Sequence, residues 1–268
     1  MSYDLVIVGG GRMGAALAEG LVRAAWAPRE RLAVVQPSLA KREALAARLN
    51  GVAVLEALSA ADVGDATGAI LCVKPDYAES VARAVAATGV ARMLSVVAGL
   101  TTARLEAAIG RPIPVVRSMP NTPVLVGQGA TAIAGGSHVT SEDLAWAESI
   151  LGAVGSVVRV TERNIDAVTG LSGPMPAYLY LVVEALIEAG VHQGLPREVA
   201  RTLVVDSFIG SAALLAASSS SPEELREQVT SPGGTTAAGL YTLERHAVRS
   251  AFMEAVAVAA ERSRQLGR

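Results

Sequence analysis

The chain contains 268 residues, of which 51% are hydrophobic and 18% are charged, and its formal net charge is −2. This length and composition predict a folded chain with enough core for two domains and argue against disorder. A nearly neutral chain without a long basic run attracts a phosphate backbone only weakly, so we expect no nucleic-acid partner. The three histidines share no ligand spacing, and we therefore expect no metal site.

The N-terminus and the apolar stretches predict a soluble, cytoplasmic protein without a membrane partner. The chain leads into its first strand without a basic, cleavable leader. No apolar run approaches the length of a membrane span, because the most lipid-like stretch, residues 178–183, is interrupted by Glu184. The single cysteine, Cys72, lies in an apolar string and is expected to be a buried thiol rather than a nucleophile.

The first predicted strand, residues 4–8, runs directly into a turn with the pattern G-x-G-x-x-G and then into a helix. This order of elements places a pyrophosphate at the N-terminus of the helix. Gly9 makes the turn, Gly11 admits the phosphate and Gly14 lets the helix pack on the strand. The pattern predicts a dinucleotide site with contacts from Gly9, Gly11, Arg12, Met13 and Gly14.

The end of the second predicted strand, residues 32–35, indicates which dinucleotide is bound. An NAD-selective site usually has an acidic residue there, which accepts a hydrogen bond from the ribose 2′-hydroxyl. The chain has none; Ser38 follows the strand, and Lys41 and Arg42 lie one turn into the next helix. These side chains favour a 2′-phosphate, so we expect NADPH as cofactor, with NADH as a possible substitute.

Strands and helices alternate as far as residue 160, which predicts an α/β domain with a mainly parallel sheet. Further strands are expected at residues 52–54, 69–73, 93–97, 114–117, 129–134 and 156–160, with helices near 59, at 77–87, from Thr101 or Thr102, and at 141–151. Ligands of such sheets bind beyond the carboxyl ends of the strands. The candidates there are Lys74, Pro75, Ala98, Gly99 and Asn121.

Beyond Asn164 the sequence predicts only helices, at residues 176–191, 196–217, 222–229, 236–245 and 247–266. The helix at 196–217 is apolar around most of its circumference. Such a helix suits burial inside an interlocked dimer better than a place on the surface. We therefore expect a homo-oligomer formed through these C-terminal helices.

The stretch S-P-G-G-T-T at residues 231–236 reads as a helix start built for an anion. Ser231 or Thr235 can cap the helix, and the two glycines let the backbone approach a ligand. Free N–H groups and the positive end of the helix dipole then favour a carboxylate. Taken alone, the same stretch also fits an ordinary capped turn.

With these motifs in view, the chain resembles the pyrroline-5-carboxylate reductases, which make proline by reducing a cyclic imine. The resemblance covers essentially the whole length, and T-S-P-G-G-T-T-A-A-G-L at residues 230–240 is its most specific part. The other matching stretches are residues 7–14, C-V-K-P at 72–75, S-V-V-A-G at 95–99, R-S-M-P-N-T-P at 117–123, 166–173 and P-A-Y at 176–178.

The resemblance implies a Rossmann domain at residues 1–162 and an all-helical domain at 163–268 that dimerises by intertwining, with dimers often assembled into a ring. It implies an NAD(P)H-dependent imine reductase for the last step of proline biosynthesis. The substrate is expected beside the nicotinamide, with its carboxylate held largely by backbone N–H groups of two loops. The implied substrate-binding residues are Ser172, Gly173, Pro174, Met175, Ser231, Gly233, Gly234, Thr235 and Thr236.

The sequence departs from the family pattern in two places, which involve three residues. Pro174 and Met175 replace a serine and a glycine near the substrate, and proline removes one backbone donor. Ser59 stands where the family often has asparagine, on the adenosine side of the cofactor. The first departure bears on substrate choice, and the second bears on cofactor contacts.

A protonated imine already accepts a hydride well, so the chain does not need a strong general acid. Tyr178 and Thr236 are candidates to donate or relay a proton, and Glu162 is a candidate to favour the cationic iminium, although each also fits a packing or capping role. Two alternatives remain open at this point: a reductase of another cyclic imine carboxylate, and an inactive NADP(H)-binding regulator. A β-hydroxyacid dehydrogenase is improbable, because no lysine occurs beyond Lys74 to act as its acid and base.

Overall fold

The computed structural model describes residues 2–267, which form two compact units. The first unit comprises the chain as far as Pro174 together with the residues from Ala257 onward. The second unit comprises Met175–Val256. Each unit is described by itself below.

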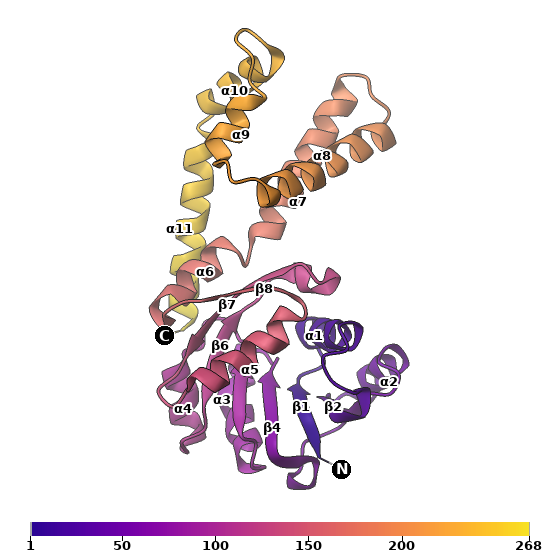
Figure 1. The fold of residues 1–268 in the computed structure, drawn as a ribbon, viewed down its shortest axis with the longest axis vertical. Coiled ribbons are helices and arrows are strands. Elements are labelled where there is room, and N and C mark those ends of the chain that lie inside the picture. The colour runs from indigo at the N-terminus through magenta and orange to yellow at the C-terminus, as the bar shows by residue number, and fades with distance from the viewer. Residues whose placement is uncertain (1, 268) are drawn as a thin grey trace. The chain divides into compact units, whose positions relative to one another are not determined.

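The first unit is built on a single eight-stranded sheet with the order β3-β2-β1-β4-β5-β6-β7-β8 (Figure 1). All neighbouring strands are parallel except β6 and β7. The chain order reverses direction in the sheet between β1 and β4, where doubly wound folds bind their ligands. The strands are β1 (Tyr3–Val8), β2 (Leu32–Val35), β3 (Ala53–Leu55), β4 (Val63–Leu71), β5 (Arg92–Ser95), β6 (Val115–Met119), β7 (Gly129–Gly135) and β8 (Gly155–Arg159).

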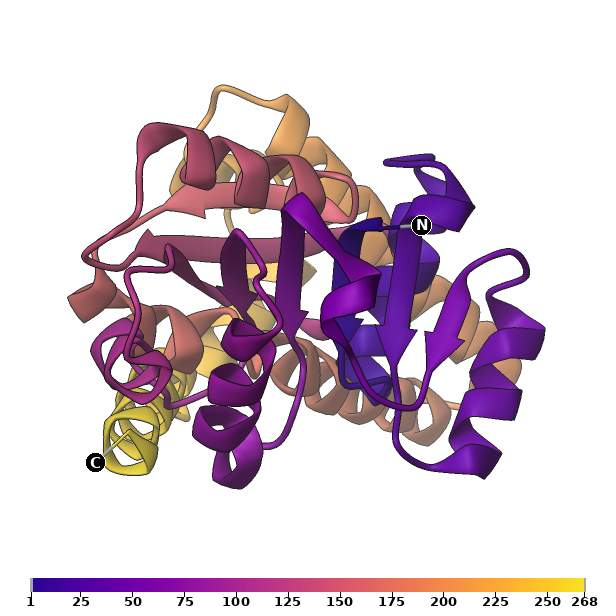
Figure 2. The same cartoon turned by 90° about the horizontal axis from the view of Figure 1, so that it is seen from below.

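Helices cover both faces of this sheet (Figure 2). One face packs against α1 (Arg12–Arg23), α2 (Leu39–Arg48) and α5 (Ser141–Gly152). The other face packs against α3 (Pro75–Ala87) and α4 (Thr102–Ile109). Short 3-10 turns complete the connections: η1 (Arg29–Arg31), η2 (Ala60–Asp62), η3 (Thr122–Val126) and η4 (Glu162–Asn164).

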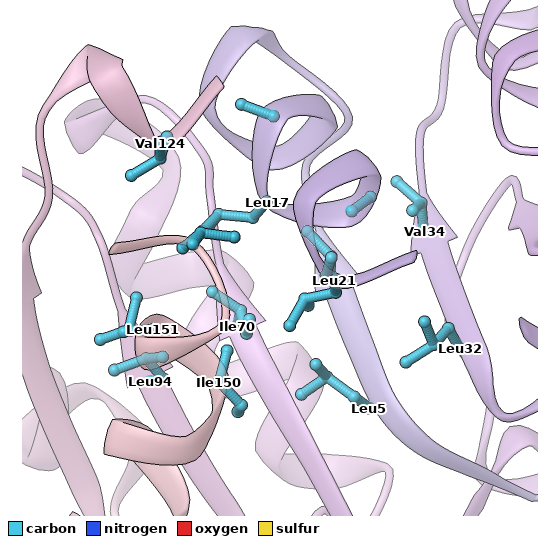
Figure 3. Close-up of a cluster of buried hydrophobic side chains, with 14 of the residues drawn as sticks. Leu5, Leu17, Leu21, Leu32, Val34, Ile70, Leu94, Val124, Ile150 and Leu151 are labelled. Atoms are coloured by element: carbon cyan, nitrogen blue, oxygen red, sulfur yellow. The ribbon is translucent and has the colours of Figure 1, made fainter. Parts of the chain in front are cut away.

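The core follows from continuous apolar strands that are buried on both faces. Along β1, Leu5 and Ile7 point to the α1 side, and Val6 and Val8 point to the α3 side, because successive strand residues alternate. On the α1 side, leucines of α1 meet strand residues such as Ile70 and side chains of α5 (Figure 3). This double packing holds the carboxyl ends of the strands, where ligands bind, in a rigid arrangement.

The predicted elements of the first unit are present, with shifts of a few residues at their ends. The largest difference is β4, which begins at Val63 rather than at residue 69. Thr101 caps α4 by accepting a hydrogen bond from the backbone N–H of Arg104, as one of the two predicted capping residues. The sequence did not predict α6 (Ile165–Leu171), a short helix. An α/β fold with a helical C-terminal region is therefore confirmed.

The compact units do not divide at residue 162, where the domain boundary was expected. The helix α6 and the last turns of α11 (Val248–Leu266) pack with the first unit. Ser263 Oγ lies 2.7 Å from Asp166 Oδ1, and Arg104 Nη1 donates to the carbonyl oxygen of Gly267 at 3.0 Å. These contacts between distant parts of the sequence explain the difference.

The second unit contains only helices among its described residues, as the sequence predicted. They are α7 (Met175–His192), α8 (Arg197–Ala217), α9 (Pro222–Gln228), α10 (Thr235–Arg245) and the first part of α11. Within the single chain, α8 exposes large apolar side chains, including Leu203, Ile209 and Leu214.

Two helical segments are longer and more apolar than the sequence analysis expected. Arg197–Ala217 and Glu162–His192 are both long and apolar enough to cross a membrane by these criteria alone. The expectation that no apolar run approaches membrane length is therefore wrong. Two such segments are weak evidence for a membrane protein, because buried helices of soluble proteins and interfaces have the same character.

Candidate functional site

The turn between β1 and α1 requires glycine at two of its predicted positions. Gly9 has φ +111°, and a Cβ atom there would lie 2.4 Å from the carbonyl oxygen of Cys72. A Cβ atom on Gly14 would lie 2.0 Å from the carbonyl oxygen of Gly9. At Gly9 the positive φ and the backbone that follows β4 exclude a larger residue. At Gly14 the close approach of α1 to the end of β1 excludes one.

Gly11 differs from these two because it faces open space. It is the N-cap of α1, and no atom lies within 4 Å of the position that its Cβ would occupy. The first backbone N–H groups of α1, on Arg12, Met13 and Gly14, have no partner within the helix. Together with the helix dipole they form an anion site beside an open cradle, and this geometry fits the pyrophosphate of a dinucleotide.

Gly10 is a constrained glycine that the sequence analysis did not single out. A Cβ atom there would lie 2.4 Å from Cδ1 of Leu45, on α2. The run of three glycines was the only available signal, and the G-x-G-x-x-G pattern treats this position as variable.

An apolar pocket of about 250 Å³ lies at the carboxyl ends of β1, β2 and β4. Its position beside Gly9 and its apolar walls suit an adenosine group. The sequence analysis placed Ser38 near this end of the sheet but missed most of the lining. The lining residues are Val8, Gly9, Val35, Pro37, Glu56, Ala57, Leu58, Val73, Val81, Ala84 and Val85.

Three further predicted cofactor residues lie near the starts of helical turns. The hydroxyl of Ser59 is 2.6 Å from Asp62 Oδ2 in a capping box, so it already has a hydrogen-bond partner within the protein. Lys74 is the exposed N-cap of α3, and Pro75 is the first residue of that helix, where proline is favoured.

Ala98, Gly99 and Asn121 follow β5 and β6 at the same edge of the sheet. Ala98 is half-buried. Gly99 has φ +74° and lies under Leu266, whose Cβ would be 2.9 Å from a Cβ on the glycine. The end of α11 therefore covers Gly99. Its contact with a cofactor stays a prediction.

Asn121 is buried and joins two segments by hydrogen bonds. Its Oδ1 accepts from the backbone N–H of Ala130 at 2.9 Å, and its Nδ2 donates to the carbonyl oxygen of Ser172 at 3.2 Å. Ser172 is the C-cap of α6 and the first residue of the predicted substrate loop. In this structure Asn121 therefore fixes the position of that loop.

Glu162 is held by protein groups, and its proposed role in favouring the cationic iminium stays a prediction. Its Oε1 accepts from Arg117 Nη1 at 2.9 Å and from the backbone N–H of Thr102 at 3.1 Å. Arg117 is only 2% exposed and also lies 3.6 Å from Asp166 Oδ1. The sequence analysis treated Arg117 only as part of a motif. An arginine that follows two valines in a predicted buried strand was the signal that it would need a carboxylate partner.

The predicted substrate loop lies where the chain leaves the first unit. A Cβ on Gly173 would lie 2.8 Å from the carbonyl oxygen of Thr169, so this position has no room for a side chain. Pro174 is the last residue of the first segment of that unit, and Met175 is the first residue of α7 in the second unit. Both are partly buried.

Tyr178 lines an apolar cavity of about 340 Å³ within the second unit. The other lining residues are Leu181, Val182, His246, Val248, Ala251, Phe252 and Ala255. The only other titratable group in this lining is His246. The cavity by itself does not identify a proton donor.

The turn before α10 contains a glycine with positive φ but not the predicted cap. Gly233 has φ +72°, and the N–H of Gly234 donates to the carbonyl oxygen of Ser231 at 3.0 Å. Gly234 is the N-cap, and no side chain caps the helix. The expectation that Ser231 or Thr235 would cap is therefore wrong. Without a capping side chain, the N–H groups of the first turn, which include Thr235 and Thr236, are left for a ligand.

Comparisons with known proteins agree over the whole chain. Residues 162–266 match a family model described as pyrroline-5-carboxylate reductase dimerisation, and residues 4–99 match one described as NADP oxidoreductase coenzyme F420-dependent. The chain is 40% identical to the pyrroline-5-carboxylate reductase of Corynebacterium melassecola, with 98% of each sequence covered. It is also 40% identical to the Synechocystis sp. enzyme of the same name, with 100% of each covered.

Solved structures agree with this similarity. Plasmodium falciparum pyrroline carboxylate reductase with NADP bound has a TM-score of 0.86 and 33% identity, with 98% of each chain covered. The Coxiella burnetii pyrroline-5-carboxylate reductase has a TM-score of 0.89 and 32% identity over 100% of both chains. The likeness in sequence and in fold extends from one end of the chain to the other. The chain belongs to the pyrroline-5-carboxylate reductase family.

Proposed function

We propose that the chain reduces pyrroline-5-carboxylate to L-proline with NADPH, the last step of proline biosynthesis. One observation carries this proposal: the open phosphate cradle at Gly11 occurs in a chain that matches curated reductases of this name over its full length. No observation favours the two alternatives, a reductase of another cyclic imine or an inactive regulator.

The first unit holds the cofactor. Backbone N–H groups at the start of α1 bind the pyrophosphate, with Gly9, Gly11, Arg12, Met13 and Gly14 around it. The apolar pocket takes the adenosine, with Ser38 and Lys41 beside β2 on the side of the ribose. NADPH supplies the hydride when it is bound. The remaining proposed cofactor contacts are Ser59, Lys74, Pro75, Ala98 and Gly99. Asn121, also a candidate from the sequence, has its amide engaged by Ala130 and Ser172, and we propose that it acts by holding the substrate loop.

The turn before α10 holds the substrate carboxylate. Gly233 and Gly234 shape this turn, and the N–H groups of Thr235 and Thr236 donate to the carboxylate. The positive φ of Gly233 explains why this turn needs glycine there. The other proposed substrate contacts are Ser172, Gly173, Pro174, Met175 and Ser231.

The chain promotes the reaction mainly by positioning and by excluding water. Reacting carbons must be held about 3–3.5 Å apart and aligned, and such orientation supplies a large part of the rate enhancement. A protonated cyclic imine needs no further activation to accept a hydride. Tyr178 and the exposed hydroxyl of Thr236 remain the proposed groups for moving a proton.

The family model for residues 162–266 supports a homodimer formed through the C-terminal helices. A partner copy would cover apolar side chains that α8 exposes in the single chain, including Leu203 and Ile209. We assign cofactor binding to residues 1–162 and dimerisation with substrate binding to residues 163–268. A soluble enzyme of the cytoplasm is consistent with this assignment.

The proposed function is tested with the purified full chain. NADPH and pyrroline-5-carboxylate are mixed, the loss of NADPH absorbance is followed, and proline is measured by mass spectrometry. Loss of NADPH matched by an equal amount of proline supports the proposal. Tight NADPH binding without turnover would identify a regulator, and turnover only with a six-membered cyclic imine would identify the other substrate class.

A further inference from the structure

Glu56 places a carboxylate in the lining of the proposed adenosine pocket. It comes from the end of β3, whereas an acidic residue in NAD sites usually follows the second strand. Glu56 follows β3, which pairs in parallel with β2 so that Val35 lies opposite Leu55. The backbone N–H of Gln36 donates to the carbonyl oxygen of Leu55 at 2.8 Å. This pairing places Glu56 beside the end of β2, and Glu56 and Pro37 both line the pocket.

Arg42 ties the ends of the two strands together. Its Nη1 donates to the carbonyl oxygens of Gln36 at 3.1 Å and Pro37 at 2.6 Å. Its Nη2 donates to Glu56 Oε2 at 3.0 Å. The side chain of Arg42 is 17% exposed, whereas that of Glu56 is 73% exposed. Arg42 does not line the pocket itself, but its guanidinium is held against two lining residues, Pro37 and Glu56. The carboxylate of Glu56 faces the solvent at the pocket.

These groups combine features of the two kinds of dinucleotide site. NAD sites place a carboxylate near the ribose, where it accepts a hydrogen bond from the 2′-hydroxyl, and NADP sites place cations there for the 2′-phosphate. Glu56 provides the carboxylate from β3 instead of β2. Arg42 has its donors engaged by two carbonyl oxygens and Glu56, so the exposed Lys41 is the more available cation.

We propose that Glu56 sets the balance between NADPH and NADH in this chain. Its carboxylate accepts a hydrogen bond from the 2′-hydroxyl of NADH and repels the 2′-phosphate of NADPH. Arg42 anchors this carboxylate and offsets part of its charge, so that NADPH still binds. This inference rests on the proposed function, because it assumes that the pocket takes the adenosine of a nicotinamide cofactor.

The test is a direct binding measurement on the full chain. Dissociation constants for NADPH and NADH are measured by titration calorimetry for the unchanged protein and for Glu56→Gln. The ratio of the NADH constant to the NADPH constant should rise about fivefold, which corresponds to about 1 kcal/mol for an exposed charge. Added salt should shrink this difference, because it screens the repulsion.

Glu30→Gln is the matched control. It removes the same charge from an exposed residue of η1, which precedes β2 at the opposite edge of the sheet. An unchanged ratio in Glu56→Gln, or an equal change in Glu30→Gln, would overturn the role of Glu56 while leaving the reductase assignment intact. If the unchanged protein binds neither cofactor, the proposed function itself fails and this inference fails with it.

Discussion

Arg117 Nη1 donates to Glu162 Oε1 at 2.9 Å, and this ion pair joins β6 to the turn that precedes α6. Asp166 lies 3.6 Å from the same guanidinium and contacts Ser263 near the end of α11. A nearly fully buried arginine thus organises segments that are 45 to almost 150 residues away in the sequence. The packing of α6 against β6 and the end of α11 depends on this cluster.

Arg117→Met should destabilise the protein by about 3–5 kcal/mol, because it leaves two partly buried carboxylates without their counter-charge. Urea unfolding followed by circular dichroism measures this loss. Arg159→Met is the matched control, since Arg159 also pairs with a glutamate, Glu148, but its side chain is 50% exposed. That control should cost much less stability than Arg117→Met, because solvent screens an exposed ion pair. Equal losses in the two variants would contradict the structural role of Arg117.

Asn121→Asp should weaken catalysis more than cofactor binding. The new carboxylate can still accept from Ala130 but cannot donate to Ser172, so the substrate loop loses its anchor. An unmade buried hydrogen bond of this kind costs about 1–3 kcal/mol, and kcat/KM for the imine should fall about tenfold or more. The dissociation constant of NADPH, measured separately, should change less than about twofold. An equal loss in both quantities would mean that Asn121 contacts the cofactor directly.

Gly234→Asp should raise KM for the imine without lowering the melting temperature. Aspartate is a favourable N-cap and accepts hydrogen bonds from the first turn, so α10 keeps its stability. The same carboxylate occupies the N–H groups proposed for the substrate and repels its negative charge, and KM should rise about tenfold or more. Gly234→Ala controls for the added Cβ, which would lie 3.1 Å from the carbonyl oxygen of Ser231. An unchanged KM in Gly234→Asp would remove this turn from the substrate site.

Cys72 should react slowly in the native protein. The residue is partly buried rather than fully buried, and desolvation still raises the pKa of its thiol above the ordinary value, so the reactive thiolate is scarce at pH 8. Because the folded pKa is the higher one, this group contributes stability below the pKa of the unfolded thiol, and the contribution is lost as pH rises beyond it. The rate of reaction with a disulfide reagent should be at least about tenfold lower in the native protein than in urea. Equal rates would show that the thiol is not protected.

The sequence by itself determined the features whose causes are local. The first glycine turn followed from a strand, a spacing of glycines and a helix in immediate succession, and the structure places Gly9, Gly11 and Gly14 as that order requires. Continuous apolar strands determined a sheet that is buried on both faces. The positions of most helices followed from their apolar spacing, because that spacing repeats within a few residues.

Only the tertiary structure decided which side chains of different helices and strands come into contact. Leu45 packs closely on Gly10, Leu266 covers Gly99, and Arg117 forms an ion pair with Glu162. Glu56 joins the cofactor pocket because β3 pairs with β2 in one particular register. Each of these outcomes depends on contacts between residues far apart along the chain. Spacing within a segment carries no information about such contacts, because they are set by how the strands pair and how the helices pack across them.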